Sequence, residues 1–120
     1  MNPEWKVEFY RDAQNKIPVN EFMESLELKT QAKVRNAIRL LQMFGISVST
    51  PLIKKLTGTD LWELRIVGSD SIRILYVTLS GRTFLLLHGF KKKKQKTPPR
   101  EINTAKMRLV DYKSRMKKLG

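Results

Sequence analysis

The segment HGFKKKKQKTPPREI, residues 88–102, holds the chain's single histidine and five lysines within the six residues 91–96. Lysine and arginine carry fixed positive charge, and histidine exchanges a proton near neutral pH. These residue types bind polyanions, and they stabilise negative charge that develops on a reacting group. A solvated basic tail and a helix on a membrane surface have a similar composition. The segment therefore predicts either one wall of a polyanion site or a solvated surface.

Positive charge is concentrated in the C-terminal quarter of the 120-residue chain, whose net charge is +13 at pH 7. Residues 88–120 contain 12 lysines and arginines and two acidic residues, a net charge of +10, whereas residues 1–87 have a net charge of only +3. A basic field of this kind attracts nucleic acid, with an affinity that falls steeply as the salt concentration rises. The charge distribution therefore predicts that the C-terminal quarter faces a polyanion.

The composition excludes several kinds of chemistry. The chain has no cysteine and one histidine, which rules out disulfides, thiolate zinc sites and cysteine nucleophiles, and we expect no metal and no cofactor. No apolar stretch approaches the roughly 20 residues that span a membrane, and the first residues lack the apolar core of a signal peptide. We therefore expect one domain, residues 1–120, in the cytoplasm.

Apolar spacing predicts the elements that position the basic residues. Trp5, Val7 and Phe9 alternate with charged residues, as in a strand. Helical spacing begins at Pro18, and a second helix ends at Gly45. The apolar faces of the two helices contain Val19, Phe22, Met23 and Leu26, and Val34, Ala37, Ile38, Leu41 and Phe44, respectively. We expect both helices to pack on a sheet.

The segments LWELRI and SIRILYV predict two neighbouring strands with apolar residues at even positions. If residues 68–70 form a hairpin loop, Arg65 lies opposite Arg73. Like charges directly opposite each other on neighbouring strands destabilise a sheet by roughly several tenths of a kcal/mol. We interpret the pair as the sign of a bound anion. The alternatives are that Arg65 pairs with Glu63 or solvent, and that Arg73 extends to solvent from a partly covered face.

A second hairpin extends the predicted sheet. A two-residue turn at Ser80 and Gly81 places His88 opposite Arg73. Arg65, Arg73 and His88 then lie together on one face of three strands, and the lysine run leaves the sheet at the same end. A lone histidine at the end of a strand is more often structural than catalytic, so this alternative stays open for His88.

The segment TPPREINTAKMRLVDYKSRMKKLG predicts a final helix. Pro98 and Pro99 lie at its start, Glu101 lies in its first turn, and Lys117 and Lys118 lie in its last turn, as the helix dipole favours. One stripe at helical spacing contains Ile102, Ala105, Leu109 and Tyr112. We therefore expect this helix to pack through that stripe, with its basic residues outward.

Four segments resemble the phage-derived HigB-like branch of the RelE/ParE toxin superfamily: VEFYRDAQNKIPVNEFMESL, LWELRI, RILYV and LLHGFKKKKQKTPPREINTAKMRLVDY. The resemblance covers nearly the whole chain, and the last segment is its most specific part. That segment matches the family pattern at His88, Gly89, Phe90, Lys92, Lys93, Gln95, Lys96, Thr97, Pro98, Glu101 and Ile102. The resemblance implies a compact α+β fold with an N-terminal strand, two helices, an antiparallel sheet and a C-terminal helix.

The resemblance also implies a function. It indicates the toxin of a type II toxin–antitoxin pair, an endoribonuclease that cleaves mRNA on the ribosome without a metal. The partner implied is a cognate antitoxin, typically a helix-turn-helix DNA-binding protein, in a hetero-oligomeric complex. Two alternatives stay open: an inhibitor of DNA gyrase of the ParE type, and a nucleic-acid-binding module without enzymatic activity.

Metal-free RNA cleavage needs a base for the 2′-hydroxyl, an acid for the leaving 5′-oxygen, and cations near the phosphate. A single histidine cannot supply both proton-transfer groups. We therefore predict that Arg65 and Arg73 hold the phosphate and that Lys92 and Lys96 stabilise the transition state or transfer protons, with His88 as a secondary candidate. Contacts with the RNA backbone are predicted for Lys54, Lys55, Lys91, Lys93, Lys94 and Arg100, and Lys93 is also a secondary catalytic candidate.

Overall fold

A computed structural model describes residues 5–45, 52–66, 68–93 and 95–119. Five strands form one mixed sheet in the order β1-β5-β4-β3-β2, with β1 parallel to β5 and the other neighbours antiparallel. The elements are β1 (Lys6–Phe9), α1 (Pro18–Glu24), α2 (Leu28–Phe44), β2 (Ile53–Lys55), β3 (Trp62–Ile66), β4 (Ser69–Leu79), β5 (Thr83–Lys91) and α3 (Pro99–Leu119). This arrangement confirms the predicted α+β class and the RelE-like order of elements.

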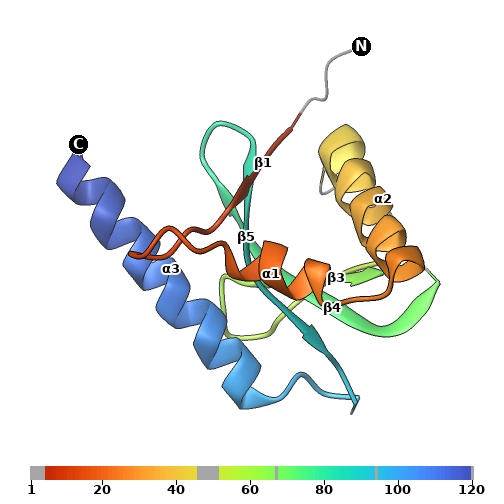
Figure 1. Cartoon of the computed structure of the whole chain (residues 1–120). Coiled ribbons are helices and arrows are strands. Elements are labelled where there is room, and N and C mark those ends of the chain that lie inside the picture. Colours follow the sequence, from red (N-terminus) through yellow and green to blue (C-terminus); the bar gives the residue numbers. More distant parts are fainter. Residues whose placement is uncertain (1–4, 46–51, 67, 94, 120) are drawn as a thin grey trace.

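The sheet separates two hydrophobic cores, because successive side chains on a strand point to opposite faces. One core lies under α1 and α2 and contains Leu64, Ile74 and Tyr76 from the strands. The other lies under α3 and contains Leu75 and Leu85. Figure 1 shows α2 and α3 on opposite sides of the sheet. No helix among the described residues is long and apolar enough to cross a membrane.

The predicted helix boundaries are confirmed at three points. Pro18 is the first residue of α1, Pro99 is the first residue of α3, and Gly45 caps the end of α2 with a φ of 61°. A side chain at Gly45 would also collide with the ring of Trp5, whose Nε1 lies 2.3 Å from an ideal Cβ. The prediction for Phe44 is wrong: its side chain is 52% exposed, so the apolar face of α2 ends one turn earlier.

The predicted pairing of β3 and β4 is confirmed. Arg65 lies opposite Arg73, and Leu64 lies opposite Ile74. The predicted loop at residues 68–70 is shorter than expected, because β4 begins at Ser69, which pairs with Ile66. A shift of register between Arg65 and Ile66 accommodates the difference.

The predicted pairing of β4 and β5 is wrong, and His88 lies opposite Leu75 rather than Arg73. The connecting turn contains three residues, 80–82, instead of two, and Arg82 adopts a φ of 57° there. A β-bulge between Leu75 and Tyr76 moves the register by one further residue. Arg73 therefore faces Phe90. The two shifts together leave His88 on its predicted face, which α3 covers, whereas Leu85, which precedes the bulge and is shifted by one residue only, points to the core opposite that of Tyr76.

Gly89 gives α1 a place to dock on β5. Its neighbours His88 and Phe90 point toward α3 and stack with ring centroids 5.5 Å apart, so Gly89 points toward α1. An ideal Cβ on Gly89 would lie 2.4 Å from Cδ2 of Phe22. The sequence His-Gly-Phe therefore combines two side chains for the α3 face with a gap for one ring on the α1 face.

Gly89→Ala is expected to lower the free energy of unfolding by about 1–3 kcal/mol, because the added methyl group overpacks the contact with Phe22. Urea denaturation measures the loss. The variant Phe22→Leu replaces the ring by a smaller side chain. Gly89→Ala should therefore lower the free energy of unfolding less in the Phe22→Leu background than in the wild type. A single variant as stable as the wild type would contradict this account of the contact.

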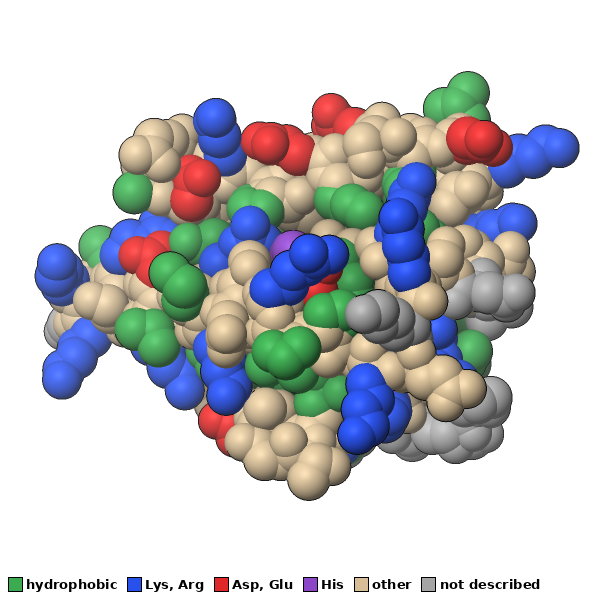
Figure 2. Space-filling model, turned by 90° about the horizontal axis from the view of Figure 1, so that it is seen from below, with side chains coloured by type: hydrophobic (Ala, Val, Ile, Leu, Met, Phe, Trp, Pro, Cys, Tyr) green, Lys and Arg blue, Asp and Glu red, His purple; other side chains and the backbone are tan. Residues whose placement is uncertain are grey.

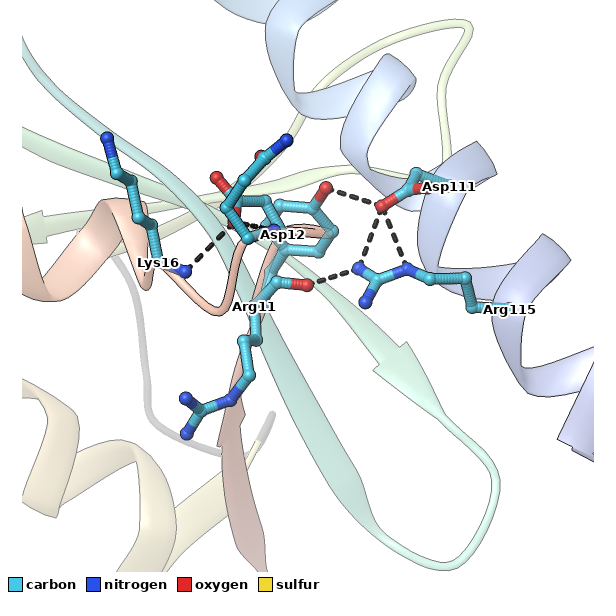
Figure 3. A network of polar contacts seen from close by, with 7 residues as sticks. Arg11, Asp12, Lys16, Asp111 and Arg115 are labelled. Carbon is cyan, nitrogen blue, oxygen red and sulfur yellow. Dashed lines mark hydrogen bonds and ion pairs between the residues drawn. The ribbon is translucent and has the colours of Figure 1, made fainter.

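The C-terminal half of α3 is held by a polar network at the end of β1 (Figure 3). The Tyr10 hydroxyl donates to Oδ2 of Asp111 at 2.6 Å, and Arg115 donates to the same oxygen at 2.8 and 3.1 Å. Arg115 also donates to the carbonyl oxygen of Arg11. These hydrogen bonds hold the pKa of Asp111 below its ordinary value, with the bond from Tyr10 as the main cause. The network fixes α3 across the sheet. The N-terminal end of α3 then lies beside the end of β5.

Candidate functional site

A hollow of about 490 Å³, named here the basic groove, lies where β5 leads into α3. Its lining residues are Lys91, Lys93, Lys96, Thr97, Pro98, Pro99 and Arg100. The four cationic side chains among them are exposed. Figure 2 looks onto this end of the molecule and shows many Lys and Arg side chains, with acidic side chains mostly toward its upper edge. The groove brings together four of the predicted RNA-contacting or catalytic residues.

Lys94, also predicted to contact RNA, lies outside the described residues. Lys54 and Lys55 are exposed on the edge strand β2 and do not line the basic groove. Lys55 donates to the carbonyl oxygen of Thr59, and its ammonium group lies 5.8 Å from the ring centroid of Trp62. The structure therefore separates these two lysines from the lysines that follow β5.

A buried ion cluster lies beneath the basic groove. Its centre is Glu63 on β3, whose exposed fraction is 0%. Oε1 of this carboxylate lies 3.3 Å from Nζ of Lys92 and 3.5 Å from Nε of Arg73. Oε2 accepts a hydrogen bond from the Thr97 hydroxyl. Arg73 and Lys92 are only 9% and 8% exposed and do not line the basic groove, so these two predicted catalytic residues lie buried beside Glu63.

The buried ion cluster partly explains why Arg65 and Arg73 can lie opposite each other on β3 and β4. The pair was expected to need an external anion, but the chain supplies a carboxylate of its own beside Arg73. Arg65 is half-buried, and its Nε is buried without a hydrogen-bond partner among the described residues. An ion pair with Glu63 was an alternative predicted for Arg65. In the structure Arg73 forms this ion pair.

His88 connects β5 to α3. Its Nδ1 lies 3.0 Å from an Arg108 nitrogen, and its Nε2 lies 2.7 Å from Oε1 of Glu101. A guanidinium group only donates, so Nδ1 is the acceptor and Nε2 carries the proton that it donates to Glu101. Arg108 also donates to the carbonyl oxygen of Leu87, the extra residue of the β-bulge. Both ring nitrogens are therefore used in docking α3.

Burial lowers the pKa of His88, and Arg108 lowers it further, against the opposing effect of Glu101. A folded pKa below the unfolded value of about 6.5 means that the unfolded chain binds more protons between these two values. The contribution of His88 to stability is therefore fully present above the unfolded pKa. It is lost as the pH falls below about 6.5 toward the folded pKa.

We expect wild-type protein to lose more stability than His88→Gln when the pH falls from about 7.5 to about 5.5. Glutamine does not titrate, so the difference between the two proteins reports the proton on His88 together with its effect on the hydrogen-bonded Glu101. Urea denaturation of both proteins at the two pH values measures it. An identical pH dependence in the two proteins would show that His88 keeps its ordinary pKa in the folded state.

Glu63, Thr97, Glu101 and Arg108 complete the site. The sequence predicted Glu63 only as an alternative partner of Arg65, and it predicted no role in the site for the other three. A signal for Glu63 was available, because it alternates with Arg65 along one strand and must share a face with it. No comparable signal exists for Arg108. Its role depends on a β-bulge that spacing alone does not reveal.

A larger hollow of about 560 Å³ lies between β1, α1 and α3, away from the basic groove. Its lining includes Glu8, Arg11 and Arg115, so charges of both signs face it. The described residues contain no group of three or more His, Cys, Asp and Glu side chains that could hold a metal ion. The basic groove is therefore the better candidate for a polyanion site.

The five-stranded mixed sheet, the helix pair on one face and the C-terminal helix on the other define a RelE-like fold. A family model described as "Phage derived protein Gp49-like (DUF891)" matches residues 21–110, and the chain belongs to this family. The family is of the RelE/HigB-like toxin type and is associated with toxin–antitoxin systems. The resemblance to toxins of such systems is thus confirmed. No curated protein matches the chain.

Proposed function

We propose that the protein is the toxin of a type II toxin–antitoxin system of the HigB-like branch, and that it inhibits translation as a ribosome-dependent, metal-independent mRNA endoribonuclease. The observation that carries this proposal is the basic groove, in which four exposed cations surround a hollow at the start of α3. Cations fixed around a phosphate stabilise the charge that develops as the phosphodiester is cleaved. Membership of a toxin family supports the same reading.

In the proposed reaction, the 2′-oxygen of a ribose attacks the adjacent phosphorus and gives up its proton. The bond from phosphorus to the 5′-oxygen breaks, and that oxygen takes up a proton, which leaves a 2′,3′-cyclic phosphate and a 5′-hydroxyl. Lys96 stabilises the charge on the phosphate or supplies the proton, and Lys91, Lys93 and Arg100 contact neighbouring phosphates. Arg73 and Lys92 add positive potential from the buried ion cluster.

Primer extension on mRNA after brief induction of the protein tests this function. New 5′ ends in register with codons are expected on a translated message. The matched control is the same message with its start codon removed, on which the ends should disappear. Growth inhibition without any cleavage would contradict the nuclease proposal, and a supercoiling assay with DNA gyrase would then test the alternative target.

We further propose a cognate antitoxin of the helix-turn-helix type, which binds the toxin in a hetero-oligomeric complex in the cytoplasm. Membership of a toxin–antitoxin family supports an antitoxin partner. Co-expression with the neighbouring small gene should restore growth, and the two proteins should purify together. Growth inhibition that persists in the presence of the neighbouring gene product would contradict this pairing.

A further inference from the structure

We propose that Glu63 is a positioning residue of the RNA site: its buried carboxylate anchors Lys92 and Thr97 and thereby fixes the shape of the basic groove. The inference deepens the proposed function and rests on it for the identity of the ligand, single-stranded RNA. Glu63 is the second residue of β3 and has an exposed fraction of 0%, so it does not itself contact RNA.

The carboxylate holds both ends of this segment. Lys92 is the first residue after β5, and its ammonium group lies 3.3 Å from Oε1 of Glu63. Thr97 lies two residues before α3 and donates to Oε2. The backbone N–H of Lys92 also donates to the carbonyl oxygen of Ser71 at 2.6 Å. Lys93 and Lys96, which line the groove, therefore lie between two anchors to one side chain.

The anchors oppose a repulsion that the groove itself creates. Lys91, Lys93, Lys96 and Arg100 are exposed cations around one hollow. Like charges at short range repel one another, and a segment that carries them extends unless something holds it. Glu63 supplies the acidic side chain of the buried ion cluster, beneath these cations. A cation-rich groove that keeps its shape before RNA arrives loses less entropy when RNA binds.

The rival explanation is that Glu63 is only a counter-ion, and the two explanations predict opposite signs for RNA affinity. If Glu63 acted through its charge alone, Glu63→Gln would remove a negative charge near the groove and would bind RNA more tightly. If Glu63 positions the segment, the same variant would release Lys93 and Lys96 and would bind RNA more weakly. Glutamine keeps the shape of the side chain, so its charge and ion pairs are what change.

The probe is a short single-stranded RNA with 2′-O-methyl riboses, which the full-length protein can bind but not cleave. We expect Glu63→Gln to raise the Kd roughly tenfold and to flatten the dependence of log K on log salt by about 0.7 for each phosphate that the variant no longer neutralises. The matched control is Glu24→Gln, which removes one negative charge from an exposed position on α1. Its Kd should stay the same or fall slightly.

Hydrogen exchange provides a readout that does not depend on RNA. Glu63→Gln should speed the exchange of the Lys92 amide, which donates to the carbonyl oxygen of Ser71, while the amides of the central strand β4 stay protected. Thr97→Val serves as a second variant, because it cuts one anchor and leaves the buried charges paired, and it should shift both readouts in the same direction by a smaller amount.

Tighter RNA binding by Glu63→Gln, or an unchanged salt dependence, would overturn the positioning role. So would unchanged exchange of the Lys92 amide. A failure of the proposed function has a different signature: the wild type itself would not bind the RNA. In that case the exchange of the Lys92 amide alone decides whether Glu63 positions the segment.

Discussion

Lys96→Ala is expected to reduce RNA cleavage by about 10²–10³-fold, the typical effect of removing one group that stabilises a transition state. Lys96 lines the basic groove and is exposed, so its charge faces the bound phosphodiester in the proposed complex. The loss should fall on the rate of cleavage at saturating ribosome-bound mRNA. RNA affinity should change much less, because Lys91, Lys93 and Arg100 still contact the backbone.

Lys117→Ala is the matched control for this prediction. It removes the same charge from another exposed lysine, at the far end of α3, about 27 Å along the helix from Pro99. Both variants should melt at the wild-type temperature, since exposed substitutions seldom change stability by more than about 0.5 kcal/mol. If the cleavage rate of Lys96→Ala were within roughly threefold of the rate of Lys117→Ala, Lys96 would not belong to the proposed site.

The helices and the central hairpin were predictable from the sequence because each depends on local signals. Pro18 and Gly45 mark helix ends through backbone restrictions that act within one turn. The facing of Arg65 and Arg73 followed from the alternation of apolar residues on two strands, which fixes register when one face is buried.

The position of His88 was not predictable, because two small irregularities add together. A third residue in the turn moves the register of β5 by one position, and the β-bulge moves it by another. Alternation of apolar residues is insensitive to a total shift of two, since side chains return to the same face. The face of His88 was therefore right, and its neighbours were wrong.

The contrast between Lys92 and Lys96 shows what spacing in a basic run cannot resolve. Both were leading catalytic candidates, and four residues separate them in the sequence. Lys92 is buried against Glu63, whereas Lys96 is exposed in the groove. The difference arises because Lys92 pairs with a carboxylate on β3, almost 30 residues earlier in the chain, whereas Lys96 lines the groove.

The buried ion cluster predicts an asymmetry between its members. Glu63→Gln leaves Lys92 and Arg73 as neighbouring buried cations without their shared carboxylate, so it should lower the free energy of unfolding by about 3–5 kcal/mol. Lys92→Met keeps much of the volume of the side chain and leaves the carboxylate with Arg73 and Thr97. Its cost should stay below about 1.5 kcal/mol.

Thermal unfolding of the two variants measures this asymmetry, with a melting temperature for Glu63→Gln lower than that of the wild type by on the order of 10 °C. The double variant Glu63→Gln/Lys92→Met is the decisive comparison, because it removes one of the two cations that the single variant leaves without the shared carboxylate. It should be more stable than Glu63→Gln alone, although it lacks one more native side chain. Equal losses in both single variants, or a double variant less stable than either, would mean that shape rather than charge balance holds the cluster together. The positioning role of Glu63 would then lack its physical basis, since a carboxylate that neither cation requires cannot hold the segment between Lys92 and Thr97 against the repulsion of its own lysines.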